Sequence, residues 1–289
     1  MNIEISTMIG CRNNCSFCPQ KAIISQYKKN GGIPLLPMNF SFYKSCIDKL
    51  PLETCVVFSG MCEAFLNPRC TDMIFYAYEK GLPVSVYTTL MGMTIKDVKR
   101  LRKIKFPQND PHAFVVHLPS VGNIEHIKID KTYFLVLSEI YESTIPVVFH
   151  YHGDALISQL KNFFTNKIAT VERFPAHSRA SNRIVGQLKR RKGVIGCLKM
   201  KLYGSYGPIL LPDGTMILCC QDYSMKHILG NFKIQTFNEI VHGDEIQKVE
   251  LGLKDEHIDI LCRNCEFSYD INWLARIANQ KVFIPDHHE

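Results

Sequence analysis

Three cysteines near the N-terminus have the spacing of a metal-cluster site. Cys11, Cys15 and Cys18 lie in the string CRNNCSFC, which follows an apolar stretch. Three thiolates can hold three irons of a [4Fe–4S] cluster and leave the fourth iron open to a ligand, much as a catalytic zinc keeps an open position. A zinc site usually takes a fourth protein ligand, and no Cys or His follows closely enough to supply one. The spacing therefore indicates an iron–sulfur cluster with one open iron.

A second group of cysteines lies in the last third of the chain, at Cys197, Cys219, Cys220, Cys262 and Cys265. A CxxC pair with two outlying cysteines can form a zinc site with four thiolate ligands. The same set can hold a second iron–sulfur cluster. The spacing alone leaves both interpretations open.

Composition narrows the class of protein. The chain has 289 residues, 46% of them hydrophobic, and twelve cysteines, which suits a globular protein of about two domains. The N-terminal residues do not form a signal peptide, and no apolar stretch is long enough to cross a bilayer. We therefore expect a cytoplasmic protein with reduced thiols that ligate metal.

The net charge of +7 is concentrated in part in the basic run 189–192. Such a run is usually a solvated surface or a linker, although it can also attract an anionic substrate. Membrane and nucleic-acid partners are not expected.

Apolar runs alternate with helical patterns through the first 180 residues or so. The runs are rich in Val, Ile, Phe and Tyr and predict strands at Ile3–Met8, Cys55–Ser59, Val84–Thr88, Phe114–Leu118, Val147–Tyr151 and Thr170–Phe174. Helices are predicted at Phe42–Leu50, Asp72–Lys80, Ile95–Leu101, Tyr133–Glu142 and Ala155–Asn162, with Thr94 and Asp130 as N-caps. This alternation predicts a parallel sheet that either stays open or closes into a barrel.

Ligands of such a sheet bind where the strands end at their C-terminal edge. Residues capable of chemistry follow every predicted strand. They are Cys11, the segment 60–63, Thr88 and Thr89, His117 and Ser120, His150 and His152, and the segment 178–182.

The pattern changes after the basic run. Ile209–Leu211 and Met216–Cys219, joined by a turn at Asp213 and Gly214, predict a β-hairpin. A helix is predicted at Phe237–Val249 and a last amphipathic segment at Ile271–Ala278.

The N-terminal string resembles the CxxxCxΦC signature of the radical S-adenosylmethionine (SAM) superfamily, in which Φ is aromatic. The resemblance implies an α/β fold, a partial (β/α)6 TIM-like barrel, over residues 1–190. It also implies that SAM chelates the open iron and is cleaved to methionine and a 5′-deoxyadenosyl radical, which abstracts hydrogen from a substrate. Phe17, at the aromatic position, would lie against the adenine.

Two further strings match motifs of the same superfamily. VVFSGMCEAFLNP resembles the GGE motif and implies SAM contacts by Gly60, Cys62 and Glu63, with the Glu63 carboxylate accepting from the SAM ammonium group. SRASN resembles SRAGN and implies that Arg179 binds SAM or substrate, acting by positioning or electrostatics. Looser matches add Thr88, Ser120 and His150 to the candidate cofactor contacts.

LLPDGTMILCCQDYSMKHILGN resembles the auxiliary-cluster domain called SPASM, or its shorter twitch form. The resemblance implies a small β-hairpin-plus-helix domain over 191–289 that holds a second [4Fe–4S] cluster through Cys197, Cys219, Cys262 and Cys265. Cys220 is then the spare cysteine, and the absence of cysteines after Cys265 favours the twitch form.

A core followed by a twitch domain resembles the layout of radical SAM aminocyclitol dehydrogenases. This resemblance implies an oxidoreductase that oxidises a substrate radical through the auxiliary cluster, with a sugar or aminocyclitol alcohol as substrate and flavodoxin or ferredoxin as reductant. The alternatives are a radical SAM maturase of short peptides and a non-catalytic iron–sulfur electron-transfer or binding protein.

Overall fold

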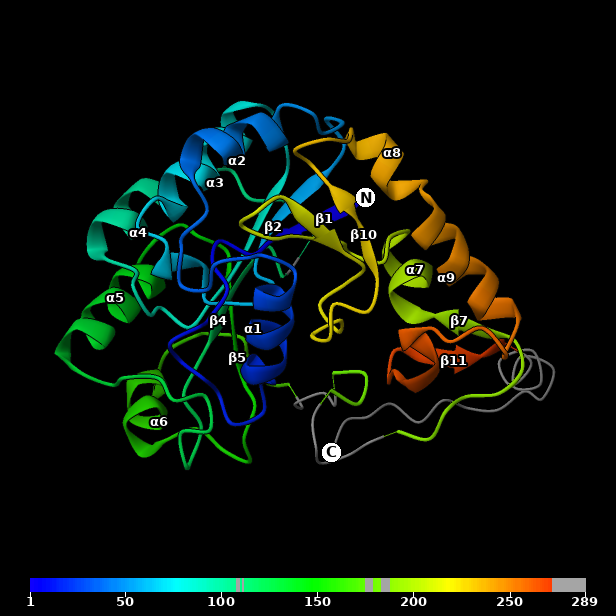
Figure 1. The fold of residues 1–289 in the computed structure, drawn as a ribbon. Coiled ribbons are helices and arrows are strands. Elements are labelled where there is room, and N and C mark those ends of the chain that lie inside the picture. Colours follow the sequence, from blue (N-terminus) through cyan, green and yellow to red (C-terminus); the bar gives the residue numbers. More distant parts are fainter. Residues whose placement is uncertain (108–109, 111, 175–178, 183–187, 272–289) are drawn as a thin grey trace.

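The computed structural model describes residues 1–107, 110, 112–174, 179–182 and 188–271. Its main element is a nine-stranded sheet in the order β10-β9-β8-β1-β2-β3-β4-β5-β6 (Figure 1). The six strands from β1 to β6 pair in parallel with their neighbours. They span Asn2–Ile5, Cys55–Phe58, Val84–Thr88, Phe114–His117, Val147–Tyr151 and Val171–Arg173. This is the expected α/β architecture of a partial barrel.

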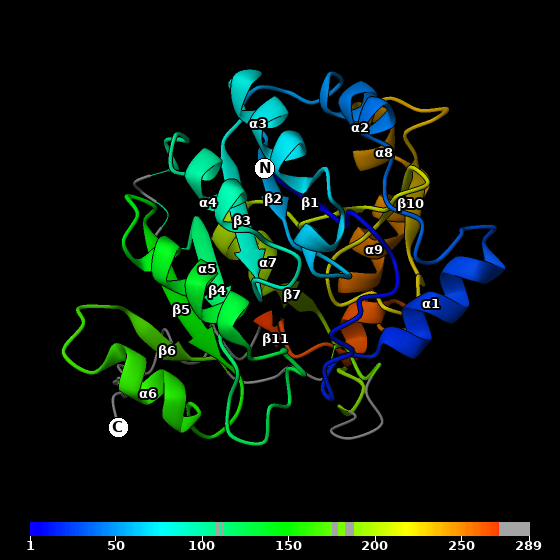
Figure 2. The same cartoon turned by 90° about the vertical axis from the view of Figure 1, so that its left-hand side faces the viewer.

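Five helices cover the outer side of the curved sheet, as the arc from α2 to α6 shows in Figures 1 and 2. They are α2 (Phe40–Ile47), α3 (Cys70–Glu79), α4 (Ile95–Leu101), α5 (Lys131–Tyr141) and α6 (Ser158–Phe164), with the short 3-10 helix η1 (Ala64–Leu66) after β2. α1 (Gln20–Lys29) lies apart from this arc, and its Ile23 and Tyr27 share a separate apolar cluster with Ile209 and Ile217. The two predicted N-caps are confirmed, because Thr94 forms a capping box with Asp97 and the Asp130 side chain accepts from Tyr133 N.

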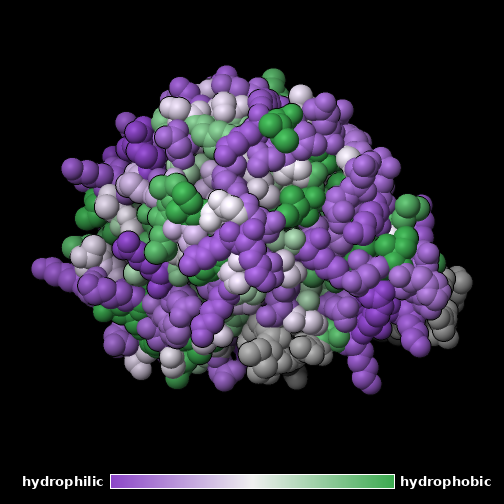
Figure 3. Space-filling view, in the orientation of Figure 1, coloured by the Kyte–Doolittle hydropathy of each residue, from purple (hydrophilic) through white to green (hydrophobic). Residues whose placement is uncertain are grey.

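The core lies between this helical layer and the sheet. Phe58, Phe114 and Phe149 come from β2, β4 and β5 and are at most 1% exposed. Burying a side chain of this size stabilises the fold by roughly 1.5–3 kcal/mol, so the core fixes the sheet on which the strand ends are mounted. On the face seen in Figure 3, apolar side chains are scattered in small groups among hydrophilic ones, as is normal for a protein surface.

The predicted hairpin does not form a sheet of its own. β8 (Ile209–Leu210) and β9 (Thr215–Ile217) are antiparallel, and β10 (Ile228–Asn231) follows β9. β8 also pairs in parallel with β1, so that the hairpin extends the barrel sheet. Ile209, Leu210 and Ile217 are fully buried. A hairpin without a polar face has to be covered on both sides, and docking on β1 achieves this.

The remaining elements follow the barrel in sequence. A two-stranded antiparallel sheet joins β7 (Ile195–Cys197) to β11 (Ser268–Asp270), and α7 (Leu198–Tyr203) and the 3-10 helix η2 (Leu261–Asn264) lie near it in the chain. The prediction of one helix at Phe237–Val249 was wrong. The segment forms α8 (Phe237–Val241) and α9 (Asp244–Lys254), because Gly243 adopts an extended conformation that interrupts the helix.

The predicted strands all occur, Val84–Thr88 and Val147–Tyr151 with the predicted bounds. Helix α1 and strand β10 were not predicted. The predicted segment Ile271–Ala278 lies, beyond its first residue, outside the described residues. Among the described helices, none has the length and apolar character needed to span a membrane.

Candidate active site

The C-terminal ends of the parallel strands open into a cavity of about 1320 Å³. It collects most of the residues that the sequence singled out. Its lining includes Cys11, Cys15, Phe17, Cys18, Gly60, Cys62, Glu63, Thr88, Thr89, His117, His150, His152 and Arg179. Ser120 is not among the lining residues, so the structure does not bring that candidate into the cavity.

Gln20 organises the N-terminal cysteine loop. Its Oε1 accepts from Cys11 N at 3.1 Å, and its Nε2 donates to Met61 O at 2.8 Å and to Cys18 Sγ at 3.3 Å. One buried amide therefore joins both ends of the cysteine loop to the segment after β2. Sequence reasoning missed Gln20, because nothing in its spacing indicates these contacts.

The cysteine loop fits an iron–sulfur cluster better than a single zinc ion. Burial raises the pKa of Cys11, and burial together with Cys18 and Cys11 raises the pKa of Cys15. Thiolates at these positions therefore need bound metal. In the described part of the chain, no three cysteine sulfurs lie within 4.8 Å of one another. A tetrahedral zinc with Zn–S bonds of about 2.3 Å requires sulfurs about 3.8 Å apart.

Glu63 is buried, and groups of the chain itself already donate hydrogen bonds to both of its carboxylate oxygens. Its Oε1 accepts from Thr88 Oγ1 at 2.8 Å and from Phe65 N at 3.2 Å. Its Oε2 accepts from the backbone N of Thr89 at 2.6 Å and the Thr89 hydroxyl at 2.7 Å. Four donors fill the lone pairs of a carboxylate. Glu63 thus joins the ends of β2 and β3, and a ligand ammonium group at this carboxylate would have to displace one of the donors.

Glu125 is a second buried carboxylate that accepts several hydrogen bonds, and it lies next to Cys15. Its Oε2 accepts from the backbone N and the hydroxyl of Ser120, at 3.0 and 2.9 Å, and its Oε1 accepts from His152 N at 3.2 Å. Its carbonyl oxygen lies 3.2 Å from Cys15 Sγ. Ser120 therefore supports Glu125 rather than facing the cavity. Glu125 was missed by sequence reasoning.

Three histidines from β4 and β5 form an aromatic wall of the cavity. The rings of His117 and His152 stack with centroids 5.0 Å apart, and Phe17 lies 4.6 Å from His152. Burial lowers the pKa of His117, His150 and His152, so all three are neutral at pH 7. His152 Nδ1 lies 2.8 Å from Phe174 O. Because a carbonyl only accepts, Nδ1 carries the proton and Nε2 is the basic nitrogen.

Arg179 lies on a strained loop between the two cysteine groups. Arg179, Ala180 and Ser181 all have positive φ, at 54°, 50° and 63°, a conformation that is unfavourable for non-glycine residues. The carboxylate of Glu266, next to Cys265, accepts from the N–H groups of Arg179 and Ala180 at 3.1 and 3.2 Å. The guanidinium lies 5.8 Å from the Tyr223 ring centroid, and its buried Nε has no hydrogen-bond partner.

The four predicted C-terminal ligands share a second, small apolar pocket. Cys197, Cys219, Cys262 and Cys265 all line it, whereas Cys220 lines the large cavity instead. Burial raises the pKa of Cys219, and burial and Cys265 raise that of Cys262, so these thiols would ionise on binding metal. The arrangement supports Cys219 as the ligand and Cys220 as the spare.

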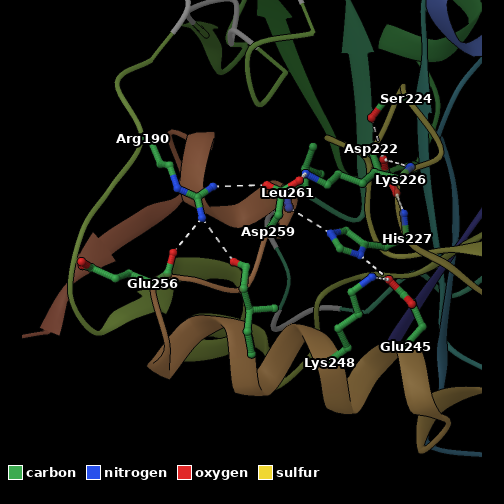
Figure 4. A network of polar contacts seen from close by, with 11 residues as sticks. Arg190, Asp222, Ser224, Lys226, His227, Glu245, Lys248, Glu256, Asp259 and Leu261 are labelled. Carbon is green, nitrogen blue, oxygen red and sulfur yellow. Dashed lines mark hydrogen bonds and ion pairs between the residues drawn. The ribbon is translucent and has the colours of Figure 1, made fainter.

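A buried polar network joins the segment that carries Cys219 to the segment that carries Cys262 and Cys265 (Figure 4). Asp222 accepts from the backbone N of Lys226 at 2.8 Å and of His227 at 2.9 Å. His227 Nε2 accepts from Leu261 N at 2.9 Å, and its Nδ1 lies 2.6 Å from Glu245 Oε1. Since Nε2 is an acceptor, Nδ1 donates to Glu245. His227 therefore links the segment after Cys219 to Leu261, next to Cys262, and to Glu245 on α9. The sequence did not reveal this role.

Arg263, between the two cysteines of the CxxC pair, is fully buried. Its guanidinium donates to the carbonyls of Gly193 at 2.5 Å and Gly252 at 2.6 Å. The buried cation thereby anchors the CxxC turn to the segment before β7 and to α9.

Comparisons with known proteins agree with this geometry. Residues 202–266 match the SPASM family model, an iron–sulfur cluster-binding domain. The chain is 21% identical over 279 residues to the S-adenosyl-L-methionine-dependent 2-deoxy-scyllo-inosamine dehydrogenase of Niallia circulans, covering 91% of each chain. It also resembles the crystal structure of BtrN in complex with AdoMet and 2-DOIA, with a TM-score of 0.60, 15% identity and 93% coverage of both chains.

A further structural relative is native anSMEcpe with bound AdoMet, with a TM-score of 0.59, 12% identity and coverage of 92% of this chain and 86% of that one. The SPASM match shows an iron–sulfur cluster-binding domain at 202–266. The fold of the whole chain resembles those of BtrN and anSMEcpe, which were solved with bound AdoMet, and the two cysteine sites lie where [4Fe–4S] clusters are expected.

Replacing His227 with Phe should disrupt the auxiliary site selectively. The change keeps an aromatic ring but removes the acceptor of the buried Leu261 N, at a cost of about 1–3 kcal/mol, and it breaks the link to Glu245 on α9. Iron in the reconstituted protein should fall from about eight to about four per chain. His242→Phe, at an exposed histidine, is the control. Retention of all the iron by His227→Phe would show that the network does not hold the site.

Replacing Tyr223 with Phe should lower the reduction potential of the N-terminal cluster. The Tyr223 hydroxyl lies 3.3 Å from Cys18 Sγ, and hydrogen bonds to cluster sulfurs raise the potential. A hydrogen bond worth about 1 kcal/mol corresponds to roughly 40 mV for one electron. Potentiometric titration followed by EPR measures the shift. Tyr27→Phe is the matched control, and an equal potential in Tyr223→Phe and wild type would contradict this role.

Proposed function

We propose that the chain is a radical SAM dehydrogenase that oxidises an alcohol carbon of a sugar or aminocyclitol. The observation that carries the proposal is the wall shared by the two sites. Lys199, Gln221 and Phe267 line both the large cavity and the pocket of the C-terminal cysteines. A substrate in the cavity is thus one layer of side chains away from the second site. We assign residues 1–190 to the radical SAM core and 191–289 to the auxiliary domain.

When bound, the cofactors supply a 5′-deoxyadenosyl radical at the N-terminal site and an electron acceptor at the auxiliary site. The alcohol then loses a hydrogen atom from carbon, a proton from the hydroxyl group and an electron, which leaves a ketone. We assign the proton to His152, whose Nε2 is unprotonated. Arg179 supplies a fixed positive charge that stabilises the oxygen as negative charge develops on it.

Several features support this proposal over its alternatives. The dehydrogenase of Niallia circulans matches nearly the whole chain, and the BtrN structure was solved with 2-DOIA. A peptide substrate is the second candidate, because anSMEcpe, which has a comparable TM-score, has been crystallised with the Cp18Cys peptide. We expect flavodoxin or ferredoxin to supply electrons. The open three-cysteine site facing a large cavity argues against a purely electron-carrying protein.

The Cys15→Ala variant tests the radical chemistry. Under anaerobic conditions with dithionite and SAM, the wild-type protein should form 5′-deoxyadenosine slowly even without substrate. Cys15→Ala should form none, because a cluster held by two of the three thiolates cannot present an open iron to SAM. Cys46→Ala, in α2 on the outer side of the barrel, should behave as wild type. Equal product from Cys15→Ala and wild type, or none from either, would refute the radical SAM mechanism here.

The Arg179→Met variant tests the oxidation step. With an aminocyclitol substrate, ketone formation should fall by about 10²–10³-fold, as when one donor to a developing oxyanion is removed. Formation of 5′-deoxyadenosine should persist, so that the two products become uncoupled. Arg179→Lys, which keeps the charge, should retain more ketone formation. If a panel of aminocyclitols and sugars yields no ketone while a short peptide is modified, the maturase alternative is correct.

A further inference from the structure

The cavity contains a second group of potential metal ligands, far from any cysteine in the sequence. His112, His150 and Glu172 each direct one ligand atom to a common point, and these atoms all lie within 4.8 Å of one another. His150 Nε2 and Glu172 Oε2 are 3.3 Å apart. The two residues are direct neighbours on β5 and β6, because His150 pairs with Glu172 in the parallel register.

We propose that His112, His150 and Glu172 form a mononuclear site for a divalent transition-metal ion. Two imidazoles and one carboxylate are a ligand set for Zn2+ and Fe2+, with the remaining positions open. Ligand atoms about 2.0–2.2 Å from a tetrahedral zinc lie about 3.3–3.5 Å apart, which the His150–Glu172 distance already matches. His112 is partly buried and Glu172 is exposed. Their side chains therefore have room to rotate and bring all three ligand atoms to coordination distance.

The state of His150 supports a ligand role. Its ring is 3% exposed, and its Nε2 has no hydrogen-bond partner. Phe174 stacks on the ring at 5.4 Å and 6°, which holds the ring plane fixed. A buried imidazole with an unsatisfied nitrogen beside a carboxylate is stabilised by a bound cation.

The position of the site suggests what the ion does. His112 and His150 both line the large cavity, so an ion held by them is accessible to a molecule in the cavity. An ion there coordinates water or an oxygen of the substrate, and as a Lewis acid it lowers the pKa of a bound hydroxyl group. Binding of the ion does not depend on the proposed dehydrogenation, and the two claims are tested separately.

Co2+ is the probe for this site, because its spectrum distinguishes nitrogen and oxygen ligands from thiolates. The cluster-loaded protein is dialysed anaerobically against Co2+, and bound cobalt is counted beside iron. The wild-type protein should bind about one Co2+ per chain without loss of iron and without a sulfur-to-cobalt charge-transfer band. His112→Ala, His150→Ala and Glu172→Gln should each weaken binding by at least about tenfold. His126→Ala, at an exposed histidine, should not.

Glu172→Gln and His112→Ala keep the test decisive even if the buried His150 variant folds poorly. Their iron content and circular dichroism should match wild type. The proposal is overturned if the wild-type protein binds Co2+ with a dissociation constant weaker than about 1 mM. It is also overturned if folded Glu172→Gln and His112→Ala bind Co2+ as tightly as wild type, or if the cobalt spectrum shows thiolate ligation.

Discussion

The parallel pairing of β1 with β8 is the constraint on which both cysteine sites depend. Glu4 and Ile5 of β1 pair with Ile209 and Leu210 of β8. The chain after β1 forms the loop of the N-terminal cysteines, and the chain after β9, the hairpin partner of β8, reaches Cys219. One edge-to-edge pairing therefore fixes the distance between two sites that are some 200 residues apart in sequence. A hairpin on a separate, mobile domain would leave that distance variable. In the proposed dehydrogenation, a constant distance would keep the second site within reach of an electron from the substrate.

Buried carboxylates stabilise the segments that this pairing brings together. Glu63, Glu125 and Asp222 are at most 5% exposed, and each accepts several hydrogen bonds from backbone N–H groups or hydroxyls. A buried ionised group is costly unless it is fully hydrogen-bonded, and a satisfied network fixes a single local conformation. Each carboxylate therefore holds two segments in one conformation. Glu63 connects the ends of β2 and β3, Glu125 lies beside the cysteine loop, and Asp222 lies in the turn after Cys219.

The strands and the cysteine sites could be predicted from the sequence because both depend on residue types and spacings within short segments. The β-branched and aromatic runs gave Val84–Thr88 and Val147–Tyr151 with the observed bounds. Gln20, Glu125, Tyr223 and His227 escaped prediction because their roles come from contacts across the fold, such as the 205 positions that separate Cys18 from Tyr223. The pairing of the hairpin with β1 was not predicted for the same reason, because the residues of a strand do not indicate which distant strand it pairs with.

The cavity wall combines buried cations with neutral imidazoles. The side next to the hairpin carries buried cations: Arg179 lies near Tyr223, and Lys199 Nζ lies 3.3 Å from Glu4 Oε1 and 3.1 Å from Cys220 Sγ. Clusters held by thiolates carry negative charge, and cations in a medium of low dielectric constant offset it more strongly than water does. The imidazoles of His117 and His152, at the ends of β4 and β5, are neutral, because burial lowers both pKa values and the charge of Arg179 contributes to this lowering. A fixed cation therefore helps to keep nearby imidazoles unprotonated. In the proposed dehydrogenation, this pairing provides a proton acceptor and a stabilising positive charge at the same substrate oxygen.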